Sequence, residues 1–421
     1  MNYKQKAFEI LERLRPELFA LGEKLFSTPE LGFKEHQTAQ TITDFFSQNN
    51  ISYESGIALT GVKASLGECG YHIALLADMD ALEVQGKEGP LVIHSCGHSI
   101  QVTVMLAVMR VLKELDLFDC LPGRVSFVAT PAEEYIDLEY RRNLIAEGKL
   151  RYASGKQNMI ADGLFDGVDC ALSCHISGDD EKQFDVGSTL AGFSVKKARF
   201  IGLSSHSGVV PHLGKNALHA ATLCLQACAF LQHQFAPEAG IRLHPILTQG
   251  GLSMNIIPEQ AVLETYLRAN TTEDLYLLQQ KFDDAALHCA AALGIGCEIE
   301  NTIGYLPLRQ SEKLNQVVYQ NMLPLCGPDA IAKNPVSGAS GDIGDVASIL
   351  PAVQFGFSGM EGRVHSDQFQ ISDLEHAYID TAKVLLGTVL DLMENNELQV
   401  NNRDYAKDKQ AYLRDWLGQS E

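Results

Sequence analysis

The stretch HIALLADMD, residues 72–80, decides the architecture of this chain. Its first six residues are apolar on both faces of an extended segment, which is typical of a strand buried in the centre of a sheet. Residues 124–129 and 169–174 repeat the pattern, and residues 102–115 between the first two strands are largely apolar and helical. Strands that alternate with helices predict an α/β fold with a mixed, mostly parallel sheet and helices on its faces.

Residue types that can bind metal ions or protons follow each of these strands. Asp78 and Asp80 follow the first strand, Glu133 and Glu134 the second, and His175 the third. Ligands bind outside the carboxyl ends of the strands in such sheets. We therefore expect these side chains to share one site.

The stretch HSCGH, residues 94–98, lies just before the helical segment. Cys96 and His98 are two residues apart, so their side chains project to the same side of an extended chain. Thiolates and imidazoles are ligands that zinc accepts. Alone, the pair fits a small buried cysteine beside a turn histidine better than it fits a metal site. With the strand ends considered, it predicts one wall of a metal site.

The candidate metal ligands are Cys96, His98, Glu134, His175 and His365. Five ligands that include a thiolate make a site for two divalent metal ions with a bridging thiolate feasible. The thiolate and imidazoles favour zinc, whereas a carboxylate also admits manganese, cobalt or nickel. Glu133, beside a ligand, is the candidate general base that accepts a proton from metal-activated water.

The texture of the chain changes near residue 187, where two strand-like runs and two helical segments suggest a small α+β unit. We expect one catalytic domain in two pieces, residues 1–186 and 306–421, interrupted by an inserted domain at 187–305.

Composition excludes several classes of function. The net charge of −20 argues against nucleic acid and anionic membrane surfaces as partners. No apolar run approaches the roughly 20 residues of a membrane span, and the charged N-terminal helix lacks signal-peptide features. Ten cysteines without CxxC pairs indicate reduced thiols. We expect a cytoplasmic protein.

The motifs stand in the order of a known family. They are STPELGFKEHQTA (27–39), LLADMDAL (75–82), HSCGHS (94–99), TPAEE (130–134), DGLFDGVDCALSCHI (162–176), GLSSHSGVVPHLGKNAL (202–218), NIIPEQAVLETYLR (255–268) and HSDQF (365–369). The chain thereby resembles the metal-dependent amidohydrolases and metallopeptidases that include aminoacylases, hippurate hydrolases, indole-acetyl-amino-acid hydrolases and aminobenzoyl-glutamate hydrolases.

The resemblance implies a zinc-exopeptidase-like catalytic domain and a lid domain that also forms a homodimer. It implies that Cys96 bridges the two metals and that His206, in the lid, polarises the scissile carbonyl group. Asn255 and Arg268 match lid positions that bind the substrate's carboxylate or hold that face together. A loop histidine and a surface ion-pair arginine are the plainer interpretations of His206 and Arg268.

The implied reaction is hydrolysis of the amide bond of a small N-acyl amino acid or short peptide. One alternative is a dipeptidase or aminopeptidase-like activity on a free amino terminus. Another is a metal-binding relative without turnover.

Two departures from the family pattern bear on the site. Ser99 stands where the family has an acid or amide that would orient a ligand, and Asp78 and Asp80 fit a similar orienting role. Residues 135–160 replace a glycine-rich run and carry five cations: Arg141, Arg142, Lys149, Arg151 and Lys156. This segment is either a solvated surface elaboration or a lining of the substrate entrance.

Overall fold

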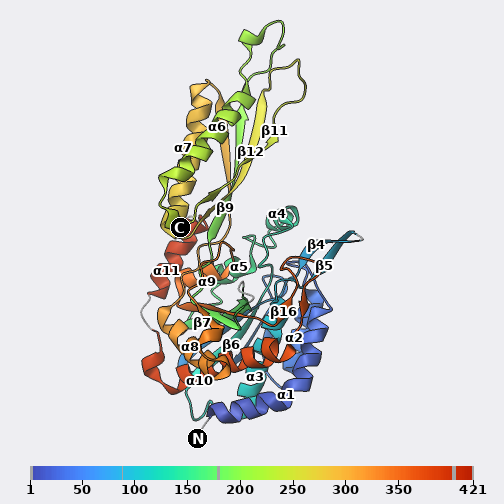
Figure 1. Cartoon of the computed structure of the whole chain (residues 1–421), viewed down its shortest axis with the longest axis vertical. Helices are drawn as coiled ribbons and strands as arrows, with labels where there is room; N and C mark the ends of the chain where they lie inside the picture. Colours follow the sequence, from blue (N-terminus) through green and yellow to red (C-terminus); the bar gives the residue numbers. More distant parts are fainter. Residues whose placement is uncertain (1–2, 88, 178–180, 401–403, 420–421) are drawn as a thin grey trace. The chain divides into compact units, whose positions relative to one another are not determined.

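The computed structural model describes residues 3–87, 89–177, 181–400 and 404–419, which form two compact units (Figure 1). Unit 1 comprises Met1–Thr189, Arg309–Ser337 and Asp345–Glu421, and unit 2 comprises Leu190–Leu308 and Gly338–Gly344. The catalytic and lid roles of the two predicted domains stay predictions. None of the helices in the described ranges combines the length and hydrophobicity that crossing a bilayer requires.

Unit 1 is built on an eight-stranded sheet in the order β1-β2-β6-β3-β7-β15-β8-β14. Its four central strands, from β6 to β15, are parallel, and the edges include antiparallel pairs. The predicted mixed, mostly parallel sheet is therefore confirmed. The strands are β1 (Tyr53–Ile57), β2 (Gly61–Leu66), β3 (Tyr71–Asp78), β6 (Gly123–Thr130), β7 (Cys170–Ile176), β8 (Phe184–Val186), β14 (Ile331–Lys333) and β15 (Ala352–Phe357).

Helices bury the apolar faces of this sheet. Ile73 and Leu75 of β3 and Phe127 of β6 share one core with α1, α2, α3, α8 and α10. Figure 1 shows α1, α3 and α10 along one side of the sheet. The helices of unit 1 are α1 (Tyr3–Phe26), α2 (His36–Gln48), α3 (His98–Leu115), α4 (Leu138–Ala146), α5 (Gly155–Ala161), α8 (Glu312–Cys326), α9 (Ile343–Ile349, mostly in this unit), α10 (Thr381–Glu394) and α11 (Tyr405–Ala411).

Two hairpin-like pairs complete unit 1. β4 (Leu82–Gly86) pairs with β5 (Gly89–Ile93), and β16 (Met360–Glu361) pairs with β17 (Gln370–Ile371). The first pair was not expected from the sequence, and its Leu82 and Val84 pack against Cys96. The second strand of this pair ends directly before the HSCGH stretch.

Parallel pairing places the carboxyl ends of β3, β6 and β7 at one edge of the sheet. Asp78 is the register partner of Thr130, the last residue of β6. Leu75 is the partner of Leu172 on the other side of β3. The segments that follow these strands carry Asp80, Glu133 and the metal-binding candidates, so the sheet itself positions the site.

Unit 2 is a five-stranded antiparallel sheet in the order β10-β12-β9-β13, with β11 also paired to β12. Helices α6 and α7 pack on each other and on its long strands. Its elements are β9 (Gly192–Ile201), α6 (Ala217–Leu231), β10 (Arg242–Leu243), β11 (Ile246–Gln249), β12 (Gln260–Ala269), α7 (Thr272–Ala292) and β13 (Gly296–Ile303).

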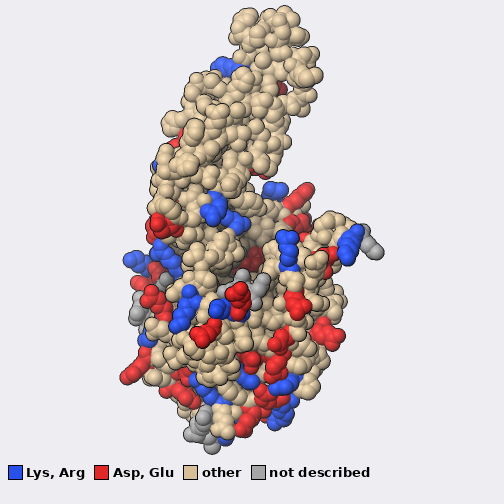
Figure 2. Space-filling model, in the orientation of Figure 1, with Lys and Arg blue, Asp and Glu red and all other residues tan. Residues whose placement is uncertain are grey.

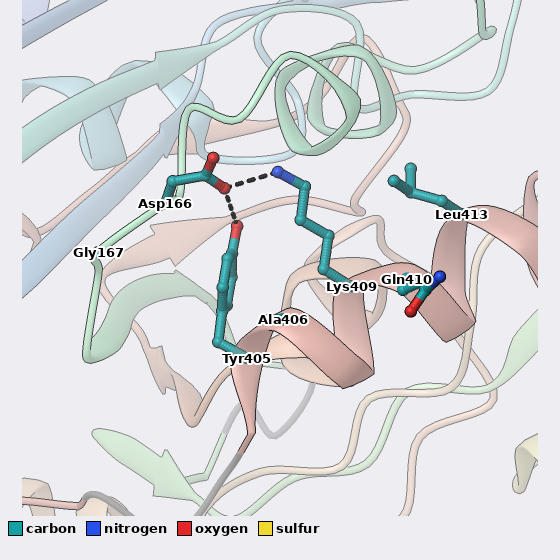
Figure 3. A pocket seen from close by; sticks show the side chains of 7 residues that line it. All are labelled: Asp166, Gly167, Tyr405, Ala406, Lys409, Gln410 and Leu413. Carbon is teal, nitrogen blue, oxygen red and sulfur yellow. Dashed lines mark hydrogen bonds and ion pairs between the residues drawn. The ribbon is translucent and has the colours of Figure 1, made fainter. Parts of the chain in front are cut away.

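The C-terminal helix α11 is fastened to the turn that precedes β7 (Figure 3). Tyr405 donates its hydroxyl hydrogen to Asp166 Oδ1 at 2.7 Å, and Lys409 Nζ lies 2.6 Å from the same oxygen. Leu413 lines the shallow pocket between the helix and this turn. Two polar contacts with Asp166 therefore join α11 to this turn.

Candidate metal centre

Cys96 lies in the bend between β5 and α3. Its Sγ is 3.5 Å from Nε2 of His175 and 3.5 Å from Nε2 of His365. The bend needs Gly97, because its φ is +78° and a Cβ there would lie 2.4 Å from a methyl carbon of Ile176. The backbone thus aims the thiol at the end of β7.

His98 is oriented by its neighbour Asp80. Its Nδ1 lies 2.8 Å from the carbonyl oxygen of Asp80, which only accepts hydrogen bonds. Nδ1 therefore donates a hydrogen bond to this oxygen, and Nε2 is the nitrogen that remains to bind a metal. His98 is 1% exposed, and among the described residues its Nε2 has no hydrogen-bond partner.

The side chains of the two glutamates after β6 each lie close to a candidate ligand histidine. Glu133 Oε2 lies 3.9 Å from His98 Nε2, and Glu134 Oε1 lies 3.6 Å from His365 Nε2. The backbone N–H of Glu134 donates to Asp80 Oδ2 at 3.0 Å. Asp80 therefore contacts both His98, through its backbone carbonyl oxygen, and the glutamate turn, through its carboxylate.

Three overlapping groups of possible ligands arise, each with its ligand atoms within 4.8 Å of one another: Cys96 with His98 and His175, Cys96 with Glu134 and His365, and His98 with Glu133 and Glu134. Cys96 belongs to two of them, which is the arrangement that a bridging thiolate needs. Soft and borderline donors together fit zinc and its neighbours. The buried Oε1 of Glu134 has no hydrogen-bond partner in the described part of the chain, which also fits a cation site.

The electrostatics of the site favour a bound cation. Burial, followed by the charge of Glu134, raises the pKa of the Cys96 thiol well above its usual value. Burial lowers the pKa of His175 to about 4, so its ring is neutral at pH 7, the form that binds metals. Burial also opposes the charge of Glu134, but His365 and His98 leave its pKa below the usual value. A cation stabilises both the thiolate and the carboxylate.

Asp78 is bonded to a lysine and a threonine. Its Oδ1 accepts hydrogen bonds from Lys156 and from Thr130 Oγ1, the latter at 2.6 Å. Burial alone would raise its pKa, but the Lys156 charge lowers the pKa of Asp78 to about 2. The carboxylate neutralises a buried lysine, and its role in orienting a ligand histidine stays a prediction. Ser99 is buried, and its Oγ has no hydrogen-bond partner in the described ranges.

Three candidate site residues, His206, Asn255 and Arg268, belong to unit 2. His206 is exposed, and its Nδ1 accepts the backbone N–H groups of Gly208 and Val209, each at 3.2 Å. The proton of the neutral ring is therefore on Nε2, which is a donor. Asn255 is exposed, and Arg268 donates to the carbonyl oxygen of Gly338 at 2.9 Å.

The cationic segment after Glu134 is partly internal. Arg141 and Lys156 are each 1% exposed, whereas Arg142, Lys149 and Arg151 are exposed. A solvated surface elaboration is therefore wrong for two of the five cations. Sequence reasoning also missed Glu35, a fully buried carboxyl that lies inside the STPELGFKEHQTA motif and bonds to the turn before Glu133.

Comparison with known proteins identifies the family. The model of peptidase family M20/M25/M40 matches residues 74–391. An Xaa-Arg dipeptidase of Mus musculus is 27% identical over 413 residues, covering 93% of this chain and 89% of that protein. An N-acetyl-L-cysteine deacetylase of Bacillus subtilis is 26% identical over 413 residues, covering 92% and 91%.

Solved structures share the fold. A Staphylococcus aureus protein described as an aminohydrolase has a TM-score of 0.80 at 22% identity, covering 93% of this chain and 100% of that one. A dinuclear metal-binding peptidase of Bacillus subtilis has a TM-score of 0.70 at 19% identity, covering 91% and 99%. The chain belongs to peptidase family M20/M25/M40 and is a metal-dependent hydrolase.

Proposed function

We propose that this hydrolase cleaves the amide bond of small N-acyl amino acids or dipeptides at a pair of divalent metal ions. Cys96, His98, Glu134, His175 and His365 would hold the ions. The observation that carries the proposal is the membership of Cys96 in two ligand groups, with Glu133 in a third group that shares His98 with one of them and Glu134 with the other. Zinc or manganese are the proposed ions, with cobalt or nickel as alternatives.

Divalent metals at this position would lower the pKa of water and polarise the scissile carbonyl group. Glu133 takes a proton from the attacking water and later delivers it to the leaving nitrogen. Its side chain is 11% exposed, so bulk water competes little for this proton. His206 donates from Nε2 to the developing oxyanion when the lid closes, and Asn255 and Arg268 hold the substrate's carboxylate.

A dipeptidase activity is the second candidate, and the similarity to an Xaa-Arg dipeptidase favours it. The two candidates differ in the amino end of the substrate. A panel of N-acetyl, N-benzoyl and unblocked dipeptide substrates separates them. Preference for unblocked dipeptides would establish the dipeptidase, and preference for blocked substrates the aminoacylase.

The proposed test of the mechanism combines metal analysis with substitution of Glu133. Protein purified without added metal is analysed for its elements, and Glu133→Gln is compared with Glu139→Gln, a control at an exposed glutamate. We expect Glu133→Gln to lower kcat about 100- to 10,000-fold with metal content unchanged. Equal turnover of the wild type and Glu133→Gln on the panel would refute the mechanism.

We also propose a homodimer formed through unit 2. Apolar side chains are exposed on its loops: Val209 at 71%, Leu213 at 59%, Leu252 at 94% and Met254 at 101%. Figure 2 shows few charged side chains on the visible face of this unit. Exposed apolar patches of this kind mark interaction surfaces.

The ten unpaired cysteines support a cytoplasmic location.

A further inference from the structure

The turn that carries Glu133 and Glu134 contains a strained residue. Ala132 has a φ of +59°, a left-handed conformation that costs an L-residue roughly 1–2 kcal/mol. It directly precedes Glu133, so its conformation sets the direction in which the two glutamates leave β6. Surrounding contacts must hold such a residue in place.

Arg141, from α4, holds the carbonyl side of this turn. Its Nη1 donates to the carbonyl oxygens of Ala132 at 3.2 Å and Ala153 at 2.7 Å, and its Nη2 donates to the carbonyl oxygen of Glu134. One planar guanidinium group therefore ties together the residues on either side of Glu133. The fixed fork of its donors suits this task better than a lysine ammonium group does.

Glu35 holds the amide side of the same residue. Its Oε1 accepts the backbone N–H of Ala132 at 2.9 Å, and its Oε2 accepts the hydroxyl hydrogen of Thr60 at 2.6 Å. Both polar groups of the strained Ala132 are thus bonded to buried side chains. Gly32 is required beside them, because a Cβ there would lie 2.8 Å from the Cβ of Ala132.

The burial of Arg141 argues for a role beyond packing. Its partners are backbone carbonyl oxygens and the rings of Phe33 and Tyr135, 5.5 and 5.8 Å from Cζ, which are neutral groups. Burying a cation costs several kcal/mol. A neutral side chain would fill this space without that cost, so the charge is accounted for by what it bonds.

We propose that Arg141 is a positioning residue for hydrolysis, which fixes the turn 130–134 and thereby aims Glu133 at the attacking water and Glu134 at the metal pair. The assignment rests on the proposed function of these two glutamates. A displacement of catalytic groups by about 1 Å costs on the order of 100-fold in rate. Arg141 acts through the turn, and touches no substrate itself.

The test compares Arg141→Ala and Arg141→Lys with Arg142→Ala, which removes an exposed guanidinium from the next residue of α4. Amide hydrogen exchange of peptides covering residues 130–136 is measured by mass spectrometry, together with metal content, kcat and KM. We expect faster exchange in 130–136 for both Arg141 variants, with β3 and β7 unchanged, and wild-type exchange for Arg142→Ala.

For turnover we expect kcat to fall about 10- to 100-fold with KM changed less than about threefold. Millimolar guanidinium should restore part of the activity of Arg141→Ala and leave Arg142→Ala unaffected. Wild-type exchange and wild-type kcat in Arg141→Lys would overturn the proposal, and so would a loss of protection spread over the whole unit.

The exchange measurement does not depend on turnover. An inactive wild-type protein with a turn that loosens in Arg141→Ala would refute the proposed function and support the positional role. A fully active wild type with an unchanged turn in both Arg141 variants would support the proposed function and refute the positional role.

Discussion

Glu35 shows how a single buried carboxyl contributes to the site at the scale of one residue. Burial, followed by the charge of Asp80, raises its pKa from 4.5 to about 8. The folded protein therefore binds a proton that the unfolded chain releases above pH 4.5. The stabilisation is fully present below pH 4.5 and is lost as the pH rises towards 8.

We predict that Glu35→Gln, which resembles the protonated carboxyl, gains stability relative to the wild type as the pH rises from 4.5 to 8. Glu35→Ala should cost about 1–3 kcal/mol at pH 5, because it leaves the buried N–H of Ala132 without its acceptor. Urea unfolding of the three proteins at several pH values checks both expectations. A pH-independent difference between Glu35→Gln and the wild type would contradict the shifted pKa.

The buried pair Lys156–Asp78 supports a second prediction at this scale. The side chains are 1% and 5% exposed. Lys156→Met leaves Asp78 charged and without its cation, and should destabilise the protein by about 3–5 kcal/mol. The double variant Lys156→Met, Asp78→Asn should recover most of this loss. Urea denaturation of the single and double variants measures this recovery. A double variant no more stable than Lys156→Met would show that the two side chains are not coupled.

At the scale of an element, the order of α11 depends on its contacts with the rest of unit 1, including those with Asp166. A helix of seven residues is not stable alone in water, so its order comes from contacts with the rest of unit 1. Asp166 provides two of these contacts, with Tyr405 and Lys409 (Figure 3). Its side chain is 60% exposed, so the energies involved are small.

We therefore predict that Asp166→Ala loosens residues 404–419 while shifting the global free energy of unfolding by less than about 1 kcal/mol. Hydrogen exchange should show faster exchange confined to that segment. Asp162→Ala is the matched control, because Asp162 is another exposed aspartate and pairs with Arg151 instead. Equal exchange in the two variants would show that Asp166 does not anchor α11.

At the scale of the whole molecule, the proposed dimer makes a separate prediction. Replacement of the fully exposed Met254 by Asp places a charge in the apolar loop of unit 2. We expect this variant to be monomeric in sedimentation-velocity experiments at micromolar concentration, with its circular dichroism unchanged. Leu374→Asp, an exposed apolar position of unit 1, should leave the mass at that of the dimer. A wild-type mass for Met254→Asp would exclude this surface as the interface.

Local sequence determined much of the fold. The apolar run before Asp78 and the matching runs before Thr130 and His175 predicted central parallel strands, because only a strand covered on both faces is apolar on both faces. Parallel pairing then made it possible to expect Glu133, Glu134 and His175 at one edge. Cys96 and His98 followed from their own spacing, and His365 joined them as a third imidazole of the candidate ligand set.

Tertiary structure alone decided how these residues are held. Asp78 and Asp80 are two positions apart and look equivalent in the sequence, but Lys156 neutralises the first, whereas the second contacts His98 and the backbone of Glu134. Arg141 and Glu35 carry no local signal of burial, because a charged residue is predicted to be exposed until its partners are known. Those partners are backbone groups of Ala132, Glu134 and Ala153, and only the folded chain brings them to these two side chains.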